Sequence, residues 1–361
     1  RYAINSHSKK NVLIVIHDFK EAEKKNIGGT TLHVHDLITN MKEEFNFHVL
    51  YYSDDDFKYH VTSFLPFDKI TSTLGAYSQY TTLNLYNDTF NRDIKILIDT
   101  LKIDLIHIHH LKHMYLDIFK VAKERSIPVI YTLHDFYSIC PSVKLFNKET
   151  FLCNYANAAG CGSCIAKTFN LNINFIPLWR KEFYENLKTV KKIIVPSYKN
   201  IFLNTYKDLT IEVVEHGYDK INGNPNNDNP DKKKNKKFNI AFIGYITEEK
   251  GLKYLEELTE KVKGTDINVH LFGQTTNKKC NKNKKNYVYH GKYIQQDLPN
   301  LLLENDIKLI CLLSMWPETY SYTLSESLIS EIPVISFDLG AIAERVKKAD
   351  VGWILPINST L

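Results

Sequence analysis

The sequence predicts an α/β fold in which two Rossmann-like domains, each a parallel sheet flanked by helices, face a cleft. Short runs rich in apolar residues, such as residues 12–16 (VLIVI) and 238–243 (FNIAFI), are typical of buried parallel strands. Each of these two runs leads into a helical pattern, and the series restarts after a polar stretch with two prolines at residues 221–237. The chain has 361 residues, which is enough for two domains of ordinary size.

The polar stretch sets the predicted domain boundaries. We expect an N-terminal domain at residues 1–219, with a cysteine-rich insert at residues 140–164. A linker at residues 220–237 would then lead to a C-terminal domain at residues 238–361.

The composition indicates a soluble globular protein. Hydrophobic residues make up 43% and charged residues 24% of the chain, and no apolar run reaches 18 residues. The first ten residues lack an initiator Met and the apolar core of a signal peptide, so we expect a piece of a longer, cytoplasmic protein. The net charge of +5 favours anionic partners, such as diphosphates or an acidic membrane surface, and falls short of a nucleic-acid footprint.

Two carboxylates mark the stretch at residues 316–330 (WPETYSYTLSESLIS). Glu318 and Glu326 are separated by seven residues, and Ser321 between them is a candidate N-cap of a helix. On one helix, residues at this spacing would lie about 12 Å apart along the axis and would not share one small target. With Glu318 in the loop before the helix and Glu326 within it, the two suit opposite ends of an elongated ligand. Backbone amides at a helix start favour an anion between them. A nucleotide sugar, with hydroxyls at both ends and a diphosphate in the middle, fits this layout.

In the first domain, two glycines stand between a strand and a helix. Gly28 and Gly29 follow the apolar run at residues 12–16 and precede a helical pattern at residues 32–41, as at the start of a nucleotide-binding unit. The full G-x-G-x-x-G fingerprint is absent, and a flexible turn that caps the helix is the alternative.

Polar residues also follow two further strand-like runs. One run ends in His109 and His110, and the next ends in His134 and Asp135. The carboxyl ends of strands in an open α/β sheet face the ligand crevice, so these histidines are candidates to line a site. The alternatives are histidines bonded to neighbouring loops and an Asp135 that only caps the next helix.

Four of the six cysteines fall within 25 residues: Cys140, Cys153, Cys161 and Cys164. The last two form a C-x2-C knuckle, and four thiolates suit a tetrahedral zinc ion. We expect a structural zinc site there. Unpaired buried thiols, an iron–sulfur cluster and disulfides formed in vitro are the alternatives.

The stretch at residues 316–330 resembles the E-x7-E signature of the retaining glycosyltransferases of family four, which have the two-domain GT-B fold. The order of strand, WPET and helix, followed by IPVI and LGA, looks like the C-terminal half of that family. Gly244, Tyr245 and Lys250 stand where the family has G-R-x(n)-K-G. Lys250 therefore matches the lysine that clamps the donor diphosphate, whereas Tyr245 replaces the family's arginine.

The resemblance implies transfer of a sugar from a nucleotide-diphosphate donor to a hydroxyl acceptor with retention of configuration. Glu326 would hold the ribose, and Glu318 would hold the transferred sugar and support the transition state. Lys250 would stabilise the departing diphosphate. Further donor contacts are expected from Gly244, from Tyr245 and from the backbone amides of Tyr320, Ser321, Tyr322 and Thr323.

The resemblance also assigns roles to the first domain. His134 would touch the transferred sugar, and Gly28 and Gly29 would let the backbone approach the diphosphate or the acceptor. No Asp-x-Asp motif stands where a metal-dependent transferase needs one, so we expect chemistry without a divalent ion. The acceptor would be a glycan or a lipid-linked glycan in surface polysaccharide assembly, and peripheral contact with the inner face of a membrane is expected.

Two other functions stay open. A non-catalytic glycan- or nucleotide-binding module of a larger glycan-assembly protein could use the aromatic segment at residues 53–90, and Tyr245 in place of arginine favours it. A GT-B sugar-nucleotide epimerase or a phosphorylase could use the same fold. Near the end of the chain, Glu344 and Arg345 are expected on the surface. The final helices usual for this fold are missing after Leu361, so a truncated end is expected.

Overall fold

The computed structural model describes residues 9–20, 28–65, 68–74, 84–147, 151–153, 158–169, 172, 174–198, 201–218, 237–357 and 359–360. The chain forms two compact units. The first comprises Arg1–Val143, Tyr155–Pro196 and Ile201–Val214, and the second comprises Lys144–Asn154, Ser197–Asn200 and Glu215–Leu361. Of the linker predicted at residues 220–237, only Lys237 lies within the described residues.

A short segment inside the predicted N-terminal domain, Lys144–Asn154, belongs to the second unit. Phe146 packs against the apolar core of the second sheet, and Lys144 pairs with Glu249. Because these partners lie far apart in the chain, the composition of the segment alone does not indicate them.

The first unit is built on a sheet that has eight strands within its described residues, in the order β10-β9-β6-β5-β1-β2-β3-β4. The strands from β10 to β2 run parallel, whereas β3 and β4 are antiparallel additions at one edge. The strands are β1 (Lys10–Ile16), β2 (Phe45–Ser53), β3 (Lys58–Leu65), β4 (Asp68–Leu74), β5 (Leu105–Ile108), β6 (Val129–Thr132), β9 (Lys192–Val195) and β10 (Ile211–Val213).

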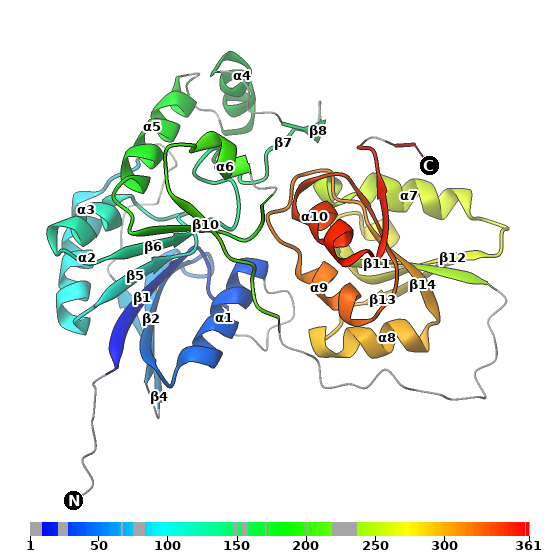
Figure 1. Ribbon diagram of the computed structural model, residues 1–361, viewed down its shortest axis with the longest axis horizontal. Helices are drawn as coiled ribbons and strands as arrows, with labels where there is room; N and C mark the ends of the chain where they lie inside the picture. Colours follow the sequence, from blue (N-terminus) through cyan, green and yellow to red (C-terminus); the bar gives the residue numbers. More distant parts are fainter. Residues whose placement is uncertain are drawn as a thin grey trace, which may run out of the picture. The chain divides into compact units, whose positions relative to one another are not determined.

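Helices cover both faces of this sheet, with α1 on one side and α2 and α3 on the other (Figure 1). Val34 and Ile38 of α1 pack against the apolar side chains of β1 and β2, because the helical spacing of four residues places them on one face. The helices of this unit are α1 (Gly29–Met41), α2 (Asp88–Leu101), α3 (Asp117–Glu124), α4 (Ala158–Phe169), α5 (Phe175–Leu187) and α6 (Ile201–Thr205).

The aromatic segment at residues 53–90, which no sequence pattern assigned, supplies the antiparallel pair β3–β4. Tyr59 on β3 is 1% exposed, and its ring centroid lies 5.2 Å from that of Tyr52 and 5.3 Å from that of Phe90. In the described part of this segment, Tyr59 and Phe90 are therefore core residues rather than an exposed platform for a glycan.

The second unit has a fully parallel sheet, with six strands in its described residues and the order β13-β12-β11-β14-β15-β16. The strands are β11 (Phe238–Ile246), β12 (Ile267–Thr275), β13 (Tyr287–Gly291), β14 (Ile307–Leu312), β15 (Val334–Phe337) and β16 (Gly352–Leu355). A separate two-stranded hairpin consists of β7 (Phe146–Asn147) and β8 (Phe151–Leu152).

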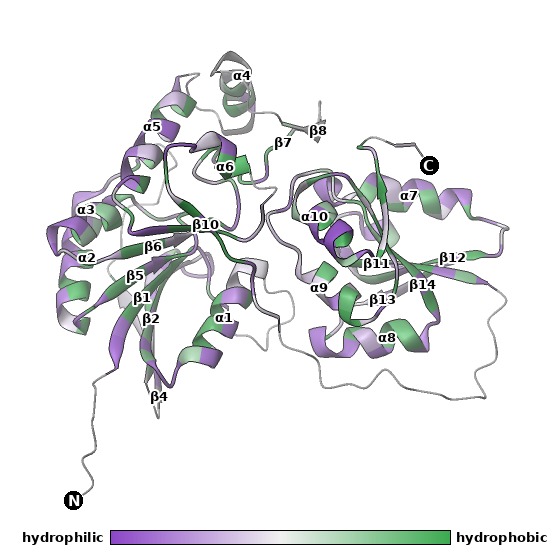
Figure 2. Ribbon diagram, in the orientation of Figure 1, coloured by the Kyte–Doolittle hydropathy of each residue, from purple (hydrophilic) through white to green (hydrophobic). Residues whose placement is uncertain are grey.

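Two apolar clusters lie on the two faces of this sheet. Leu252 and Leu255 of α7 (Leu252–Lys261) pack on one face, whereas α8 (Leu298–Glu304), α9 (Tyr322–Ile329) and α10 (Gly340–Ala349) pack on the other. Figure 2 shows the same layering as hydrophobic inner strands beneath helices that carry both hydrophobic and hydrophilic residues. A parallel sheet covered on both faces is the architecture that the apolar runs predict, and it leaves the strand ends as the polar edge.

Candidate active site

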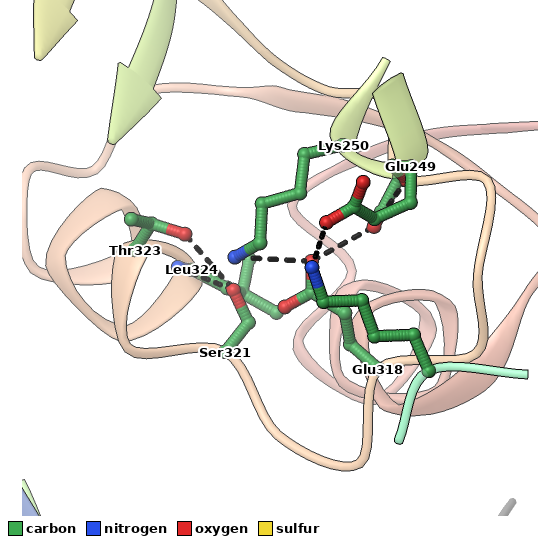
Figure 3. A network of polar contacts seen from close by, with 8 residues as sticks. Glu249, Lys250, Glu318, Ser321, Thr323 and Leu324 are labelled. Carbon is green, nitrogen blue, oxygen red and sulfur yellow. Dashed lines mark hydrogen bonds and ion pairs between the residues drawn. The ribbon is translucent and has the colours of Figure 1, made fainter. Parts of the chain in front are cut away.

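The connection between β14 and α9, residues 313–321, holds Glu318 in a polar network (Figure 3). Glu318 is 7% exposed, and Ser314 donates a hydrogen bond of 2.8 Å to its Oε1. Lys250 Nζ lies 3.5 Å from the same oxygen. Lys250 ends η1 (Glu248–Lys250), the 3-10 turn that follows β11, so two adjacent strands deliver the two residues to one place. We call them the glutamate–lysine pair.

Lys144 adds a second cation that no sequence pattern indicates. Its ammonium group pairs with Glu249, the neighbour of Lys250 in η1. Burial raises the pKa of Glu249, but hydrogen bonds from Lys144 and Thr247 outweigh it and hold the pKa below its ordinary value of 4.5. Lys144 and Glu249 are 105 positions apart, so only the folded chain brings them together.

Two glycines allow backbone segments to approach closely around this network. Gly340 has a φ of 58°, and a Cβ on it would lie 2.7 Å from the carbonyl oxygen of Glu318. The next residue, Ala341, donates its N–H to that same oxygen at 2.8 Å. Gly244 has a φ of 100°, and a Cβ there would meet Thr323 Cγ2 at 3.2 Å. Glycine at these two positions therefore permits the close packing that positions the Glu318 backbone and the start of α9.

The helix predicted after Glu318 is confirmed as α9, and Ser321 is its N-cap. Ser321 Oγ accepts a hydrogen bond of 3.3 Å from the Leu324 N–H and lies 2.9 Å from Thr323 Oγ1. The first N–H groups of an α-helix have no acceptor within the helix, so the backbone at Tyr322 and Thr323 offers donors to an anion.

Arg345 of α10 braces this helix start, and its predicted place on the surface is wrong. Its guanidinium donates to the Ser321 carbonyl oxygen at 2.9 Å and to Ser325 Oγ at 2.7 Å, and it lies 4.2 Å over the ring of Tyr320. Burial lowers the pKa of Arg345 below its ordinary value. The Tyr320 hydroxyl donates to the carbonyl oxygen of His216 at 3.0 Å, so its side chain holds the connection in place.

Glu326, the second predicted carboxylate, is 4% exposed on α9. Tyr293 donates its hydroxyl to Glu326 Oε2 at 3.0 Å. Burial raises the pKa of Glu326 to about 7, although hydrogen bonds from Tyr293 and Gln295 oppose the rise. A protonated carboxyl group accepts hydrogen bonds from hydroxyls less well than an ionised one. Because the pKa of Glu326 is about 7, its strength as an acceptor changes near neutral pH.

Tyr245 stands where the family pattern has an arginine, and its side chain is 57% exposed at the carboxyl end of β11. Its phenol carries no fixed positive charge. Lys250 and Lys144 bring ammonium groups to the carboxylates of this network, and Arg345 brings a guanidinium to the helix start.

In the first unit, His134 and His109 meet where β6 and β5 end. His109 Nδ1 lies 2.9 Å from His134 Nε2, and His109 is buried. The neighbouring residues form a second pair, because His110 Nε2 lies 2.6 Å from Asp135 Oδ2. Asp135 also accepts the N–H of Tyr137 at 2.9 Å, so it shapes the turn after β6 as well.

Gly28 is the N-cap of α1, and Gly29 is the first residue of the helix. The φ of Gly28 is −68° and its ψ is 152°, which any residue adopts. Among the described residues, a Cβ on Gly28 would meet nothing within 4 Å.

The four clustered cysteines are divided between the units, with Cys153 in the second. Cys161 and Cys164 lie on α4, and Arg180 Nη2 lies 3.5 Å from Cys161 Sγ. Cys140 Sγ lies 3.1 Å from Ser142 Oγ. Among the described residues, the group of three or more candidate metal ligands within 4.8 Å of one another consists of histidines and includes none of these cysteines.

Two family models match the sequence. Residues 27–199 match Glycosyltransferase Family 4, and residues 224–360 match the glycosyl transferases group 1. The chain belongs to the family-four glycosyltransferases. The glycosyltransferase is thus matched on both sides of the polar stretch, in the order that its motifs predict.

The chain is also similar to one curated relative and, in fold, to solved structures. The glycosyltransferase is 24% identical over 268 residues to an uncharacterized 41.2 kDa protein in the cps region of Klebsiella pneumoniae, covering 72% of this chain and 68% of that protein. Anabaena HepE in complex with UDP-glucose is 14% identical with a TM-score of 0.58, over 97% of this chain and 86% of HepE. The lipopolysaccharide outer core galactosyltransferase WaaB is 11% identical with a TM-score of 0.56, over 97% and 87%. The fold is GT-B.

None of the helices in the described part of the glycosyltransferase is long and apolar enough to span a membrane.

Proposed function

We propose that this glycosyltransferase moves a sugar from a UDP-sugar to a glycan or lipid-linked acceptor with retention of configuration, in the assembly of a surface polysaccharide. The observation that carries the proposal is the glutamate–lysine pair beside a capped helix start. A buried carboxylate suits sugar hydroxyls and a developing positive charge, and a cation beside the amides of a helix start suits a departing diphosphate. The UDP complex of HepE and the named activity of WaaB support the donor and acceptor classes.

Glu318 is proposed to bind hydroxyls of the transferred sugar and to stabilise the oxocarbenium-like transition state. Lys250 lies 3.5 Å from it, so the ammonium group orients the carboxylate and sits beside the bond that breaks. A positive charge that is already in place when the diphosphate leaves needs no reorganisation at that moment. The incoming hydroxyl gives its proton to the leaving phosphate, and the proposed chemistry needs no divalent ion.

Lys144 is proposed to supply the positive charge that Tyr245 does not. It is 47% exposed, and its partner Glu249 adjoins Lys250. The side chain is long and flexible, so its ammonium can exchange Glu249 for a phosphate oxygen. The missing arginine was the feature that favoured a non-catalytic module, and a second lysine removes that reason.

Glu326 is proposed to hold the ribose hydroxyls of the nucleotide. Its present donors are the Tyr293 hydroxyl at 3.0 Å and the Gln295 side chain, and a ribose hydroxyl can replace or join them. From the first unit, we propose that His134 contributes a contact to the transferred sugar and that Gly28 and Gly29 leave room for donor or acceptor. We also propose that the four cysteines bind zinc and that the acceptor side contacts a membrane surface.

A thermal-shift screen against UDP, GDP, dTDP, CDP and ADP tests the donor class. A ligand at about 100 times its dissociation constant adds roughly 2.7 kcal/mol to the free energy of unfolding, so we expect a clear rise of the midpoint with UDP. The rise should persist in EDTA, because the diphosphate is held by lysines and amides. Loss of the nucleotide effect on chelation would overturn the metal-independent mechanism, and no rise with any nucleotide would overturn the transferase proposal.

The stereochemistry is tested on the product. With an α-linked UDP-sugar, the proton NMR coupling of the new anomeric centre should report an α linkage. A β linkage would mean inversion, and Glu318 would then need a different role.

A further inference from the structure

Three histidines from three elements of the first unit gather at one edge of its sheet. His33 lies on α1, His109 follows β5 and His134 follows β6. Each offers a ring nitrogen, and the three nitrogens lie within 4.8 Å of one another. The ring centroid of His33 is 5.4 Å from that of His109 and 5.1 Å from that of His134. We call these residues the histidine cluster.

The sheet topology explains why these side chains meet. β1, β5 and β6 are consecutive parallel neighbours, so their carboxyl ends share one edge. The connection after β1 leads to α1 and brings His33 to that edge. Two contacts join the residues that follow β5 to those that follow β6. His109 Nδ1 lies 2.9 Å from His134 Nε2, and His110 Nε2 lies 2.6 Å from Asp135 Oδ2.

The contacts around the histidine cluster restrain its rings. His107, whose ring centroid is 4.0 Å from that of His109, bonds through Nε2 to Thr132 Oγ1 at 2.9 Å. The His110–Asp135 contact ties the turn that carries His134 to the strand end that carries His109. Rings held in this way lose little entropy when they bind a common partner.

Three convergent imidazoles are a ligand set for a transition metal. Imidazole ring nitrogens suit Zn²⁺ and its first-row neighbours. Nitrogens bound to a tetrahedral Zn²⁺ at about 2.0–2.1 Å are roughly 3.4 Å apart. His109 Nδ1 and His134 Nε2 now share a hydrogen-bond contact at 2.9 Å, and the three ligand nitrogens all lie within 4.8 Å of one another, so ring movements on the order of 1 Å bring them to this separation.

We propose that His33, His109 and His134 form a three-histidine site for a divalent first-row transition ion, distinct from the cysteines at which zinc is predicted. The ion would leave one coordination position open, as three protein ligands do at a tetrahedral centre. This site rests on the geometry of the first unit alone, and nothing in it requires the nucleotide sugar.

An effect of the ion on sugar transfer, which rests on the proposed function, follows from the position of His134. An ion would engage the nitrogen of His134, the residue proposed to touch the transferred sugar. Occupation of the site and sugar contact would then compete, and transition ions at saturating concentration would inhibit transfer without weakening UDP binding at the second unit.

Metal binding to the full chain tests the site directly. After treatment with EDTA and gel filtration, Co²⁺ is titrated in competition with a chromophoric chelator in the Cys161→Ser/Cys164→Ser background, which removes the C-x2-C knuckle. We expect one bound ion with visible d–d bands of a tetrahedral centre. His33→Ala should weaken binding by more than about 100-fold, because the loss of a group that only hydrogen-bonds to a metal ligand already costs about 10–100-fold.

The matched control is His35→Ala. His35 lies on the same helix as His33, but its Nε2 contacts the Lys20 carbonyl oxygen at 2.7 Å and its ring stacks on Phe19. This variant should bind Co²⁺ as its parent does. His109 is 1% exposed, so its substitution disturbs the packing of the first unit. His33 is half-buried, so its substitution tests the site with less effect on the fold. Equal binding by the parent and His33→Ala, or no binding by the parent, would overturn the proposal.

Inhibition separates this inference from the proposed function. Zn²⁺ should lower the transfer rate of the parent at least tenfold and leave His33→Ala active, because that variant retains His134. If metal binds and His33→Ala loses it, the site stands even when no transfer is detected with any donor. If transfer is detected and Co²⁺ does not bind, the proposed function stands without the site.

Discussion

The histidine cluster and the glutamate–lysine pair both lie at the carboxyl ends of parallel strands, each in its own sheet, yet they differ in charge. Both stand where neighbouring parallel strands end, β5 and β6 in the first unit and β11 and β14 in the second. The first gathers imidazoles, and burial lowers the pKa of His33 to about 4 and that of His107 to about 3. The second pairs a buried carboxylate with an ammonium group 3.5 Å away. The fold supplies the position, and the residue types decide which ligand that position can hold.

The largest expected effect tests the charged side of this comparison. Glu318→Gln keeps the shape of the side chain and removes its charge, so the transition state loses electrostatic support. We expect the turnover number to fall by about 10²–10³-fold, as for the removal of one stabilising group. UDP affinity should change little, because UDP lacks the transferred sugar.

The control for this variant is Glu304→Gln, an exposed carboxylate at the end of α8. It should turn over at the parental rate. A Glu318→Gln enzyme with parental turnover would place the sugar site elsewhere.

Gly340 tests whether backbone approach holds the glutamate–lysine pair in place. Gly340→Ala introduces a Cβ that would lie 2.7 Å from the Glu318 carbonyl oxygen, at a residue whose φ is 58°. We expect a loss of about 1–3 kcal/mol in the free energy of unfolding, measured by urea denaturation. Gly217→Ala, where a Cβ meets nothing within 4 Å, should leave the free energy of unfolding nearly unchanged. Equal stability of the two variants would mean that the connection relaxes freely around Glu318.

The two lysines sharpen the comparison further. Lys250→Met should lower the turnover number about tenfold or more, and Lys144→Met should lower it by up to about tenfold, because each removes one cation from the departing diphosphate. The double variant should lose less than the product of the single effects if both contact the same diphosphate. Lys253→Met, an exposed lysine of α7, is the control. If Lys144→Met turns over at the parental rate, Lys144 does not supply the positive charge that Tyr245 lacks.

The smallest expected effect is the pH dependence of donor affinity. Burial raises the pKa of Glu326 to about 7, so the carboxyl is mostly protonated at pH 6 and mostly ionised at pH 8. Ionised Glu326 accepts ribose hydroxyls, so the affinity for UDP-glucose should rise by about tenfold between pH 6 and pH 8. The diphosphate diester keeps its charge over this range. Calorimetry with Glu326→Gln should show a flat profile, and an equally steep profile would assign the titration to another group.

The raised pKa of Glu326 also makes the free energy of unfolding depend on pH. The folded protein holds the Glu326 proton between pH 4.5 and about 7, whereas the unfolded chain has released it. Stability from this group therefore falls as the pH rises through that window and is then constant. In Glu326→Gln this fall should be absent from the pH dependence of the urea midpoint.

The sequence predicted the fold from particular residues. Residues 12–16 and 238–243 became the buried central strands β1 and β11, because side chains of a parallel strand covered on both faces are nearly all apolar. Ser321 was predicted as an N-cap and is one, since capping depends on residues only three positions apart. No sequence pattern assigned the aromatic segment at residues 53–90, because the pairing of β3 with β2 and the burial of Tyr59 against Tyr52 depend on residues outside it.

The sequence by itself determined the two-domain α/β class, the family and the carboxylates and lysine of the signature, because these are recorded in local order and spacing. Only the tertiary structure decided that Lys144 reaches Glu249, that Arg345 braces Ser321, and that His33 joins His109 and His134. Each of these contacts joins elements that are distant in the chain. Their geometry is fixed by how strands and helices pack, and no pattern of neighbouring residues carries that information.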